Sequence, residues 1–355
     1  MSAEQKFAGP AGSVYEYNTL FGAASALSIV GVLHPAVEGH LAVVAGKTVP
    51  LGELSAEQVA GLESNVIKGA LAAQAAARHI AGQLDGADLI YRMRRENGNE
   101  EYIDHLVPRY PDLGDEGDPM LTTDPQLAAH GVDDTPISIQ SKYAFSPEQA
   151  TDLDVRLTLV DAFYDEDYSA YIPKGEAPAK RRGSDILDKI LSGAIKARVA
   201  YEDDDLAVVV DRNRASKDHV FVASQECVDN WWKLPPETVA KMAVVGLYLA
   251  WHMKRQDVDN ETGDIVFLTA ANQVRHPHDH VGTDRLEVRE GWTRFFDFMR
   301  RMSPKSSRMS ETHADAELDE SLRVMSSEQL QQILSARMAH MTGYFAAMRA
   351  ITPER

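Results

Sequence analysis

The order of segments in the first third of the chain returns after residue 218, and this repeated order constrains the fold most. Residues 39–44 read GHLAVV and residues 218–223 read DHVFVA, so each segment joins a histidine to strand-forming residues. Leu54 follows His40 by 14 residues, and Leu234 follows His219 by 15. A shared order of this length indicates two related units. Chance similarity between apolar runs is the alternative.

The segments that follow continue the parallel. Each copy has a helix start, LSAE or LPPE, and then an apolar periodicity that predicts helices over about residues 56–83 and 236–255. Each copy then has two apolar segments joined by a turn, over residues 87–110 and 263–281, which predicts a pair of strands. The expected fold class is therefore α+β, with two units that each contain an antiparallel sheet and helices.

An acidic segment separates the two copies. Residues 111–167 contain 14 acidic and 2 basic residues and carry −12 of the net charge of −18. Turn-forming sequences such as PDLGDEGDP and GVDDTP predict an irregular surface connection, at least as far as Pro147. A docking or regulatory segment is the alternative. The expected organisation is a first unit over 13–110, an acidic connection over 111–180, a second unit over 181–290 and a helical C-terminal extension over 291–355.

Composition excludes several classes of protein. A net charge of −18 argues against a nucleic acid or an anionic membrane as the main partner. The single cysteine, Cys227, cannot form an internal disulfide, fits a reducing compartment and excludes a cysteine-based zinc site. The longest apolar run, residues 242–253, is too short to span a bilayer, and the first residues lack a signal-peptide pattern. The expectation is a cytoplasmic protein.

Three histidines alternate with other residues in the second copy: His276, His278 and His280. On a strand they project from one face, about 6.5–7 Å apart in succession. Imidazoles contribute little to an apolar core and are costly to bury without partners. The pattern therefore favours a functional site over a solvated histidine-rich loop.

Two chemistries use such a face. A neutral imidazole can attack a phosphate ester and form a phosphoramidate, while flanking imidazoles bind the phosphate oxygens and help to protonate the leaving group. A transition-metal site with imidazole ligands is the alternative. However, Asp279 is expected on the opposite face of the strand, and no other motif of ligand spacing stands out. We therefore expect a nucleophile, with no metal and no cofactor.

These residues resemble the histidine-triad (HIT) superfamily over about residues 185–285. Residues 185–205 are similar to the opening helix, turn and strand of that family, and residues 206–211 to its second strand. The DHVFV segment, the LPPE helix start and the triad then follow in the family's order. The resemblance implies that the two units pair side by side within one chain as an intramolecular pseudo-dimer. The two-copy organisation also resembles galactose-1-phosphate uridylyltransferases and dinucleoside polyphosphate phosphorylases.

The resemblance also implies roles for individual residues. His278 would be the nucleophile, and His276 and His280 would orient it and bind phosphate. His219 would line the same pocket. The nucleotide-binding residues would be Asp211, which would accept hydrogen bonds from ribose hydroxyls, and Asn272 or Gln273, which would offer an amide to the phosphate.

The first copy departs from the triad. Glu101, Ile103 and His105 stand at its three triad positions, and an isoleucine cannot attack phosphorus. We expect this copy to be structural, with His40 and His105 as structural histidines. In the second copy, Pro277 and Asp279 replace the apolar residues that the family places between the histidines, and the uridylyltransferases have glutamine where this chain has His280.

The predicted function is that of a nucleotidyl hydrolase or transferase, which cleaves at the α-phosphate of a nucleotide conjugate through a covalent nucleotidyl-histidine intermediate. The alternatives are a non-catalytic nucleotide-binding or interaction protein and a metal-dependent hydrolase. The expected partner is a nucleotide or nucleotide-conjugate substrate, with a homodimer as a further option. The last helix, over residues 327–349, has an apolar stripe expected to pack on the main body or on a second subunit.

Overall fold

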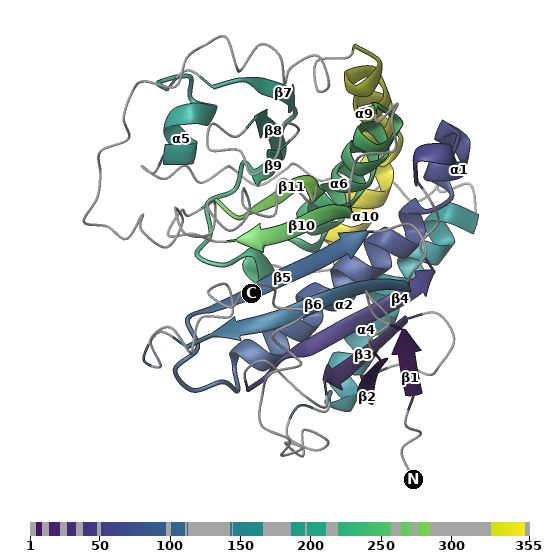
Figure 1. Cartoon of the computed structure of the whole chain (residues 1–355), viewed down its shortest axis with the longest axis vertical. Helices are drawn as coiled ribbons and strands as arrows, with labels where there is room; N and C mark the ends of the chain where they lie inside the picture. The colour runs from purple at the N-terminus through teal and green to yellow at the C-terminus, as the bar shows by residue number, and fades with distance from the viewer. Residues whose placement is uncertain are drawn as a thin grey trace.

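One antiparallel sheet organises the computed structural model (Figure 1). The structure describes residues 5–8, 14–21, 27–32, 38–47, 51–96, 101–110, 112, 143, 145–165, 186–195, 197–210, 219–256, 264–270, 276–284 and 328–351. Within these residues the sheet has eleven strands: β1 (Gln5–Ala8), β2 (Val14–Phe21), β3 (Leu27–Val32), β4 (Leu41–Lys47), β5 (Leu89–Glu96), β6 (Glu101–Arg109), β7 (Val199–Glu202), β8 (Leu206–Val210), β9 (Val220–Ser224), β10 (Asp264–Ala270) and β11 (His278–Asp284).

The helices agree with the predicted pattern. The two long helices expected from the repeat are present, the first in two pieces because the chain turns at residues 61–62. Ser55 caps the first piece, since its side chain accepts a hydrogen bond from the Gln58 amide. The helical segments are η2 (Leu51–Glu53), α1 (Ala56–Ala60), α2 (Glu63–Ala81), α4 (Pro147–Asp165), α5 (Ile186–Leu191), η5 (Trp231–Lys233), α6 (Pro236–Gln256), α9 (Glu328–His340) and α10 (Thr342–Ile351).

The strand order is the same when it is followed outward from the centre of the sheet in either direction. The order is β1-β2-β3-β4-β6-β5-β10-β11-β9-β8-β7. From the central pair, β5-β6-β4-β3 in the first copy corresponds to β10-β11-β9-β8 in the second. The copies meet where β5 pairs with β10 antiparallel, from Arg92↔Thr269 to Glu96↔Ile265. The fold is therefore α+β, and the two sheet-plus-helix units form an intramolecular pseudo-dimer, as predicted.

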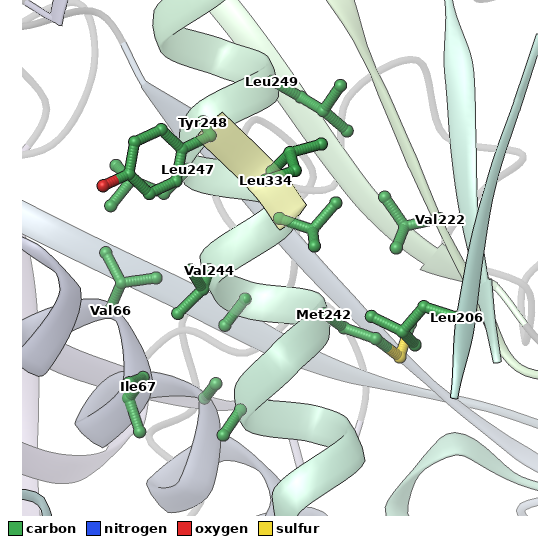
Figure 2. Packing of buried hydrophobic residues seen from close by; sticks show 14 of the residues in the cluster. Val66, Ile67, Leu206, Val222, Met242, Val244, Leu247, Tyr248, Leu249 and Leu334 are labelled. Carbon is green, nitrogen blue, oxygen red and sulfur yellow. The ribbon is translucent and has the colours of Figure 1, made fainter. Parts of the chain in front are cut away.

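A shared core joins the copies on one face of the sheet. Val66 and Ile67 of α2 belong to the same buried cluster as Val244 of α6, and Leu206 and Val222 bring in the strands of the second copy (Figure 2). All five side chains are buried because α2 and α6 lie side by side over the sheet. The copies therefore share apolar burial in this cluster, and beside it α2 forms a second cluster with first-copy strand residues such as Leu41 and Val43.

The C-terminal helices extend this core. The apolar side chains of α9 and α10 pack against α6, which confirms packing on the main body: Leu330, Leu334, Met338, Met341, Tyr344, Phe345 and Met348. The helix expected near residues 292–302 lies outside the described residues. Among the residues that are described, no helix is both long enough and apolar enough to cross a membrane.

A buried carboxylate connects four helices. Glu63 of α2 is fully buried and accepts hydrogen bonds from the hydroxyls of Tyr164 (2.6 Å) and Tyr248 (2.8 Å), on α4 and α6. Arg337 of α9 donates to both oxygens of the same carboxylate, at 2.7 and 2.5 Å. This bidentate pair fixes the C-terminal extension relative to both copies.

The second half of the acidic connection includes a helix. α4 begins at Pro147, where the irregular segment was expected to end, and buries Leu153, Val160 and Phe163 against the helices of the first copy and the C-terminal extension. Residues 113–142 lie outside the described residues. The proposed domain limits therefore remain predictions.

Candidate functional site

Two paired strands position the histidines of the second copy. β9 and β11 pair antiparallel, with His278 opposite Ala223 and His280 opposite Phe221. Side chains alternate along a strand, and Val222 and Val281 belong to the core beneath α6. His278 and His280 therefore lie on the opposite face of the sheet from α6, and His219 directly precedes β9.

The rings of this face contact one another. The centroids of the His278 and His280 rings are 4.8 Å apart in an edge-to-face arrangement. The Phe221 ring lies 5.6 Å from the His278 ring and 6.2 Å from the His280 ring, also edge to face. Because Phe221 packs against both imidazoles, it restricts their rotamers from the neighbouring strand.

The main-chain carbonyl group of His276 determines the tautomer of His278. Its Nδ1 atom lies 2.9 Å from the carbonyl oxygen of His276, and a carbonyl oxygen can only accept. Nδ1 must therefore carry hydrogen, and the lone pair of the neutral ring is on Nε2. The nitrogen suited to attack on phosphorus is the one not held by this main-chain contact.

Both nitrogens of the His276 ring lie near oxygen atoms. Nδ1 donates to the carbonyl oxygen of Ser224 at 2.9 Å, and Nε2 lies 3.1 Å from the Oδ1 atom of Asp188 on α5. Only 1% of His276 is exposed. These contacts orient the segment whose carbonyl group accepts from His278.

His219 and His280 form a buried pair. The Nε2 atom of His219 is 3.0 Å from the Nδ1 atom of His280, so one ring donates and the other accepts. Burial lowers the pKa of His280 well below its ordinary value, and the neighbouring His278 and His219 lower it further. His280 is therefore neutral at physiological pH.

The first copy contains an equivalent pair. The Nε2 atom of His40 is 3.1 Å from the Nδ1 atom of His105, which is the same pairing of atoms. The register also agrees, since His105 lies opposite Ala42 and Ile103 opposite Val44, as His280 and His278 lie opposite Phe221 and Ala223. Burial, followed by the His105 ring, lowers the pKa of His40 well below its ordinary value. The expected correspondence of His40 with His219 and of His105 with His280 is thus present.

The structure brings together four of the seven predicted site residues, His219, His276, His278 and His280. Asp211, Asn272 and Gln273 lie outside the described residues, so their nucleotide contacts remain predictions. Trp231 and Trp232 are buried in the core.

Sequence reasoning missed two residues that contact the triad, Asp188 and Phe221. Asp188 lies 88 positions before His276, and only the short amphipathic helix α5 places it at this strand end. Its neighbour Leu187 packs with Phe221 on the same face of the sheet, which explains the placement of the helix. No spacing within the triad motif itself could indicate this contact.

The described residues do not form a metal-binding site. No group of three histidine, cysteine, aspartate or glutamate side chains in the described ranges is arranged to hold an ion.

Comparisons with known proteins return solved structures but no sequence family. No family model matches the chain, and no curated protein matches it. An ADP-glucose phosphorylase from Arabidopsis thaliana with bound ADP-glucose is 9% identical, with a TM-score of 0.43, over 85% of this chain and 82% of that one. A uridylyltransferase mutant is 12% identical (TM-score 0.38; 74% and 79% covered). A zinc-bound histidine-triad family protein from Mycobacterium smegmatis is 23% identical (TM-score 0.27; 42% and 92% covered).

Proposed function

We propose that this chain is a nucleotidyl hydrolase or transferase of the histidine-triad type, in which His278 attacks the α-phosphate of a nucleotide conjugate. The observation that carries this proposal is the contact between the Nδ1 atom of His278 and the carbonyl oxygen of His276. This contact leaves the lone pair of the neutral ring on Nε2, and the His278 side chain lies on the sheet face that it shares with His280.

The proposed reaction has two steps. In the first, the Nε2 lone pair of His278 forms a P–N bond, and the bond between the α-phosphorus and the leaving-group oxygen breaks. The leaving oxygen takes a proton from a neighbouring acid or from water. In the second, an acceptor oxygen attacks the α-phosphorus, the P–N bond breaks, and the electron pair returns to Nε2.

The other histidines act on this nucleophile. His276 holds the chain through Ser224 and Asp188 and presents the carbonyl group that accepts from His278. His280 is neutral and paired with His219, so it contributes a polar ring beside the reacting phosphate without adding charge. Asp211 is proposed to bind the ribose, and Asn272 or Gln273 the phosphate.

The acceptor decides between hydrolase and transferase. Water gives a nucleotide product, whereas phosphate or a sugar phosphate gives a phosphorylase or a transferase. A substrate panel should therefore include dinucleotides and nucleotide sugars, among them ADP-glucose, each with and without added phosphate, with products identified by mass. Cytoplasmic location and assembly as a homodimer remain predictions.

A covalent adduct tests the proposal. Wild-type protein mixed with substrate and denatured rapidly at alkaline pH should carry the mass of one nucleotidyl group, and His278→Gln should carry none. His79→Gln, which changes a histidine of α2 that contacts Tyr143 and Gln149, is the matched control and should form the adduct. Nucleotide binding without adduct or turnover would support a binding protein instead. Activity that disappears with a stoichiometric metal would support the metal-dependent alternative.

A further inference from the structure

Asp279 lies between the two imidazoles in sequence but on the other face of the sheet, as its position in the strand predicted. Its side chain is buried and lines a small cavity beneath α6, together with Arg92 and Arg94 of β5 and Asp104 of β6. A carboxylate of the second copy and two guanidinium groups of the first therefore meet behind the triad.

The register explains how the two copies meet there. Arg92 is paired with Thr269 of β10, and Thr269 is paired with Asp279 of β11, so the three residues form one row across the sheet. Two strand spacings separate Arg92 from Asp279, about 10 Å between their Cα atoms. Arg94 is two residues further along β5 and points to the same face, so the long arginine side chains can approach Asp279 from the other copy.

The charges in this cluster balance. Arg92 donates to the Oδ2 atom of Asp104 through Nε (2.9 Å) and Nη2 (2.8 Å). Arg94 and Asp279 are buried opposite charges in the lining of the same cavity, 4% and 8% exposed. α6 lines the cavity with Met242, Ala243 and Gly246, which add no charge.

We propose that the first copy controls the charge behind the triad: Arg94, beside the Arg92–Asp104 pair, neutralises the carboxylate of Asp279. An uncompensated carboxylate so close to His278 would favour its imidazolium form, which has no lone pair for attack. Buried charges act over such distances because little water screens them. Arg94 and Asp279 are thus positioning residues that act through His278, and this inference rests on the proposed function only for its effect on turnover.

Other charges near His278 are few among the described residues. On the triad face these are the His276–Asp188 contact and the paired rings of His219 and His280. β9 contributes no charged side chain, and Lys241, on α6, is engaged by Asp203 and Asp205. The cluster behind β11 contains charged groups of the first copy beside Asp279, so substitutions in the first copy can change the field there.

The test follows the protonation of the His278 ring by NMR in the full chain, with ring C–H signals assigned through His278→Gln. Asp279→Asn should lower the midpoint of the His278 titration by about 0.5 pH unit or more, and Arg94→Gln should raise it by a similar amount. The double variant should return close to the wild type, since both charges are then absent. The control Asp88→Asn removes the exposed partner of Arg109 in the same copy and should leave the midpoint unchanged.

The inference would be overturned if the His278 midpoint in Asp279→Asn stayed within about 0.2 pH unit of the wild-type value, which is well below the expected shift. It would also be overturned if both single variants shifted the midpoint in the same direction. If Arg94→Gln does not fold, Asp279→Asn alone decides, and Arg94→Lys should keep the wild-type midpoint. The titration does not require turnover. Shifted midpoints in a protein that forms no adduct would therefore refute the proposed function and leave this inference standing.

Discussion

The two copies keep the same histidine pair but differ at the residue beside it. His40 and His105 are joined at 3.1 Å through the same atoms that join His219 and His280 at 3.0 Å. At the nucleophile position, however, the first copy has Ile103 and the second has His278. The pair is thus compatible with a copy that cannot attack phosphorus.

The comparison separates the structural role of the histidine pair from the proposed chemical role of His278. Each pair satisfies one nitrogen of each ring inside the protein, so it retains a structural value when the nucleophile is absent. The triad adds what the first copy lacks, an imidazole whose Nδ1 is held by a carbonyl group. The first copy, with Glu101 and Ile103 at two triad positions, therefore keeps its fold without a histidine at the nucleophile position.

The largest expected effect compares the nucleophile positions directly. His278→Ala should lower turnover by about 10⁴-fold or more, because the group that forms the P–N bond is gone. Nucleotide affinity should change far less. Ile103→Val, at the equivalent position of the first copy, should leave turnover within about threefold of the wild type. Steady-state kinetics and nucleotide titrations on both variants measure this, and near-normal turnover in His278→Ala would rule out covalent catalysis by this residue.

The helices offer a second comparison, since α2 contributes a carboxylate to the shared core and α6 contributes a tyrosine. Glu63→Ala should lower the free energy of unfolding by about 3–5 kcal/mol, because Arg337 loses its buried partner. Denaturant unfolding measures the change, and Glu53→Gln at an exposed position is the control. A loss below about 1 kcal/mol would mean that the carboxylate does not hold the helices together.

The histidine pairs themselves can be compared through matched substitutions. His219→Gln should lower turnover by about 10- to 100-fold, because His280 loses the partner that orients it beside His278. His40→Gln should leave turnover within about threefold, since no nucleophile adjoins that pair. Both variants should lose about 1–3 kcal/mol of stability through a buried ring left without its partner. Equal losses of turnover in the two variants would contradict the division of roles.

The smallest expected effect concerns pH. His40 and His280 have pKa values held well below 6.5 by burial, so below that pH the unfolded chain binds protons that the folded chain does not. Stability is therefore complete above about pH 6.5 and is lost as the pH falls below it, by roughly 1 kcal/mol for each histidine at pH 5.5. The free energy of unfolding measured at pH 7.5 and 5.5 should show this loss. His40→Gln should reduce the loss by the part that His40 contributes. A variant whose pH dependence equals that of the wild type would show that His40 does not contribute.

Much of the fold was predictable because it depends on local patterns. Residues 236–255 have a helical periodicity and form α6, and the apolar run within residues 218–223 forms most of β9. The pairing of β5 with β10 was expected only from the family resemblance, since nothing in the pattern of either strand identifies its partner in the other copy. The contact of Asp188 with His276 was not predicted at all, because it depends on where α5 packs.

The presence of two copies and the order of the predicted strands and helices within them could be inferred from the amino-acid sequence alone. So could the placement of His278 and His280 on one strand face and of Asp279 on the other. These features follow from residue spacing, because side chains alternate along a strand and repeat every 3.6 residues along a helix. Only the tertiary structure decided that the His276 carbonyl group determines the tautomer of His278, that Glu63 joins four helices, and that Arg92 and Arg94 lie behind the triad. Spacing determines the direction in which a side chain points, whereas the group that it meets there comes from distant segments brought together by the burial of a common core.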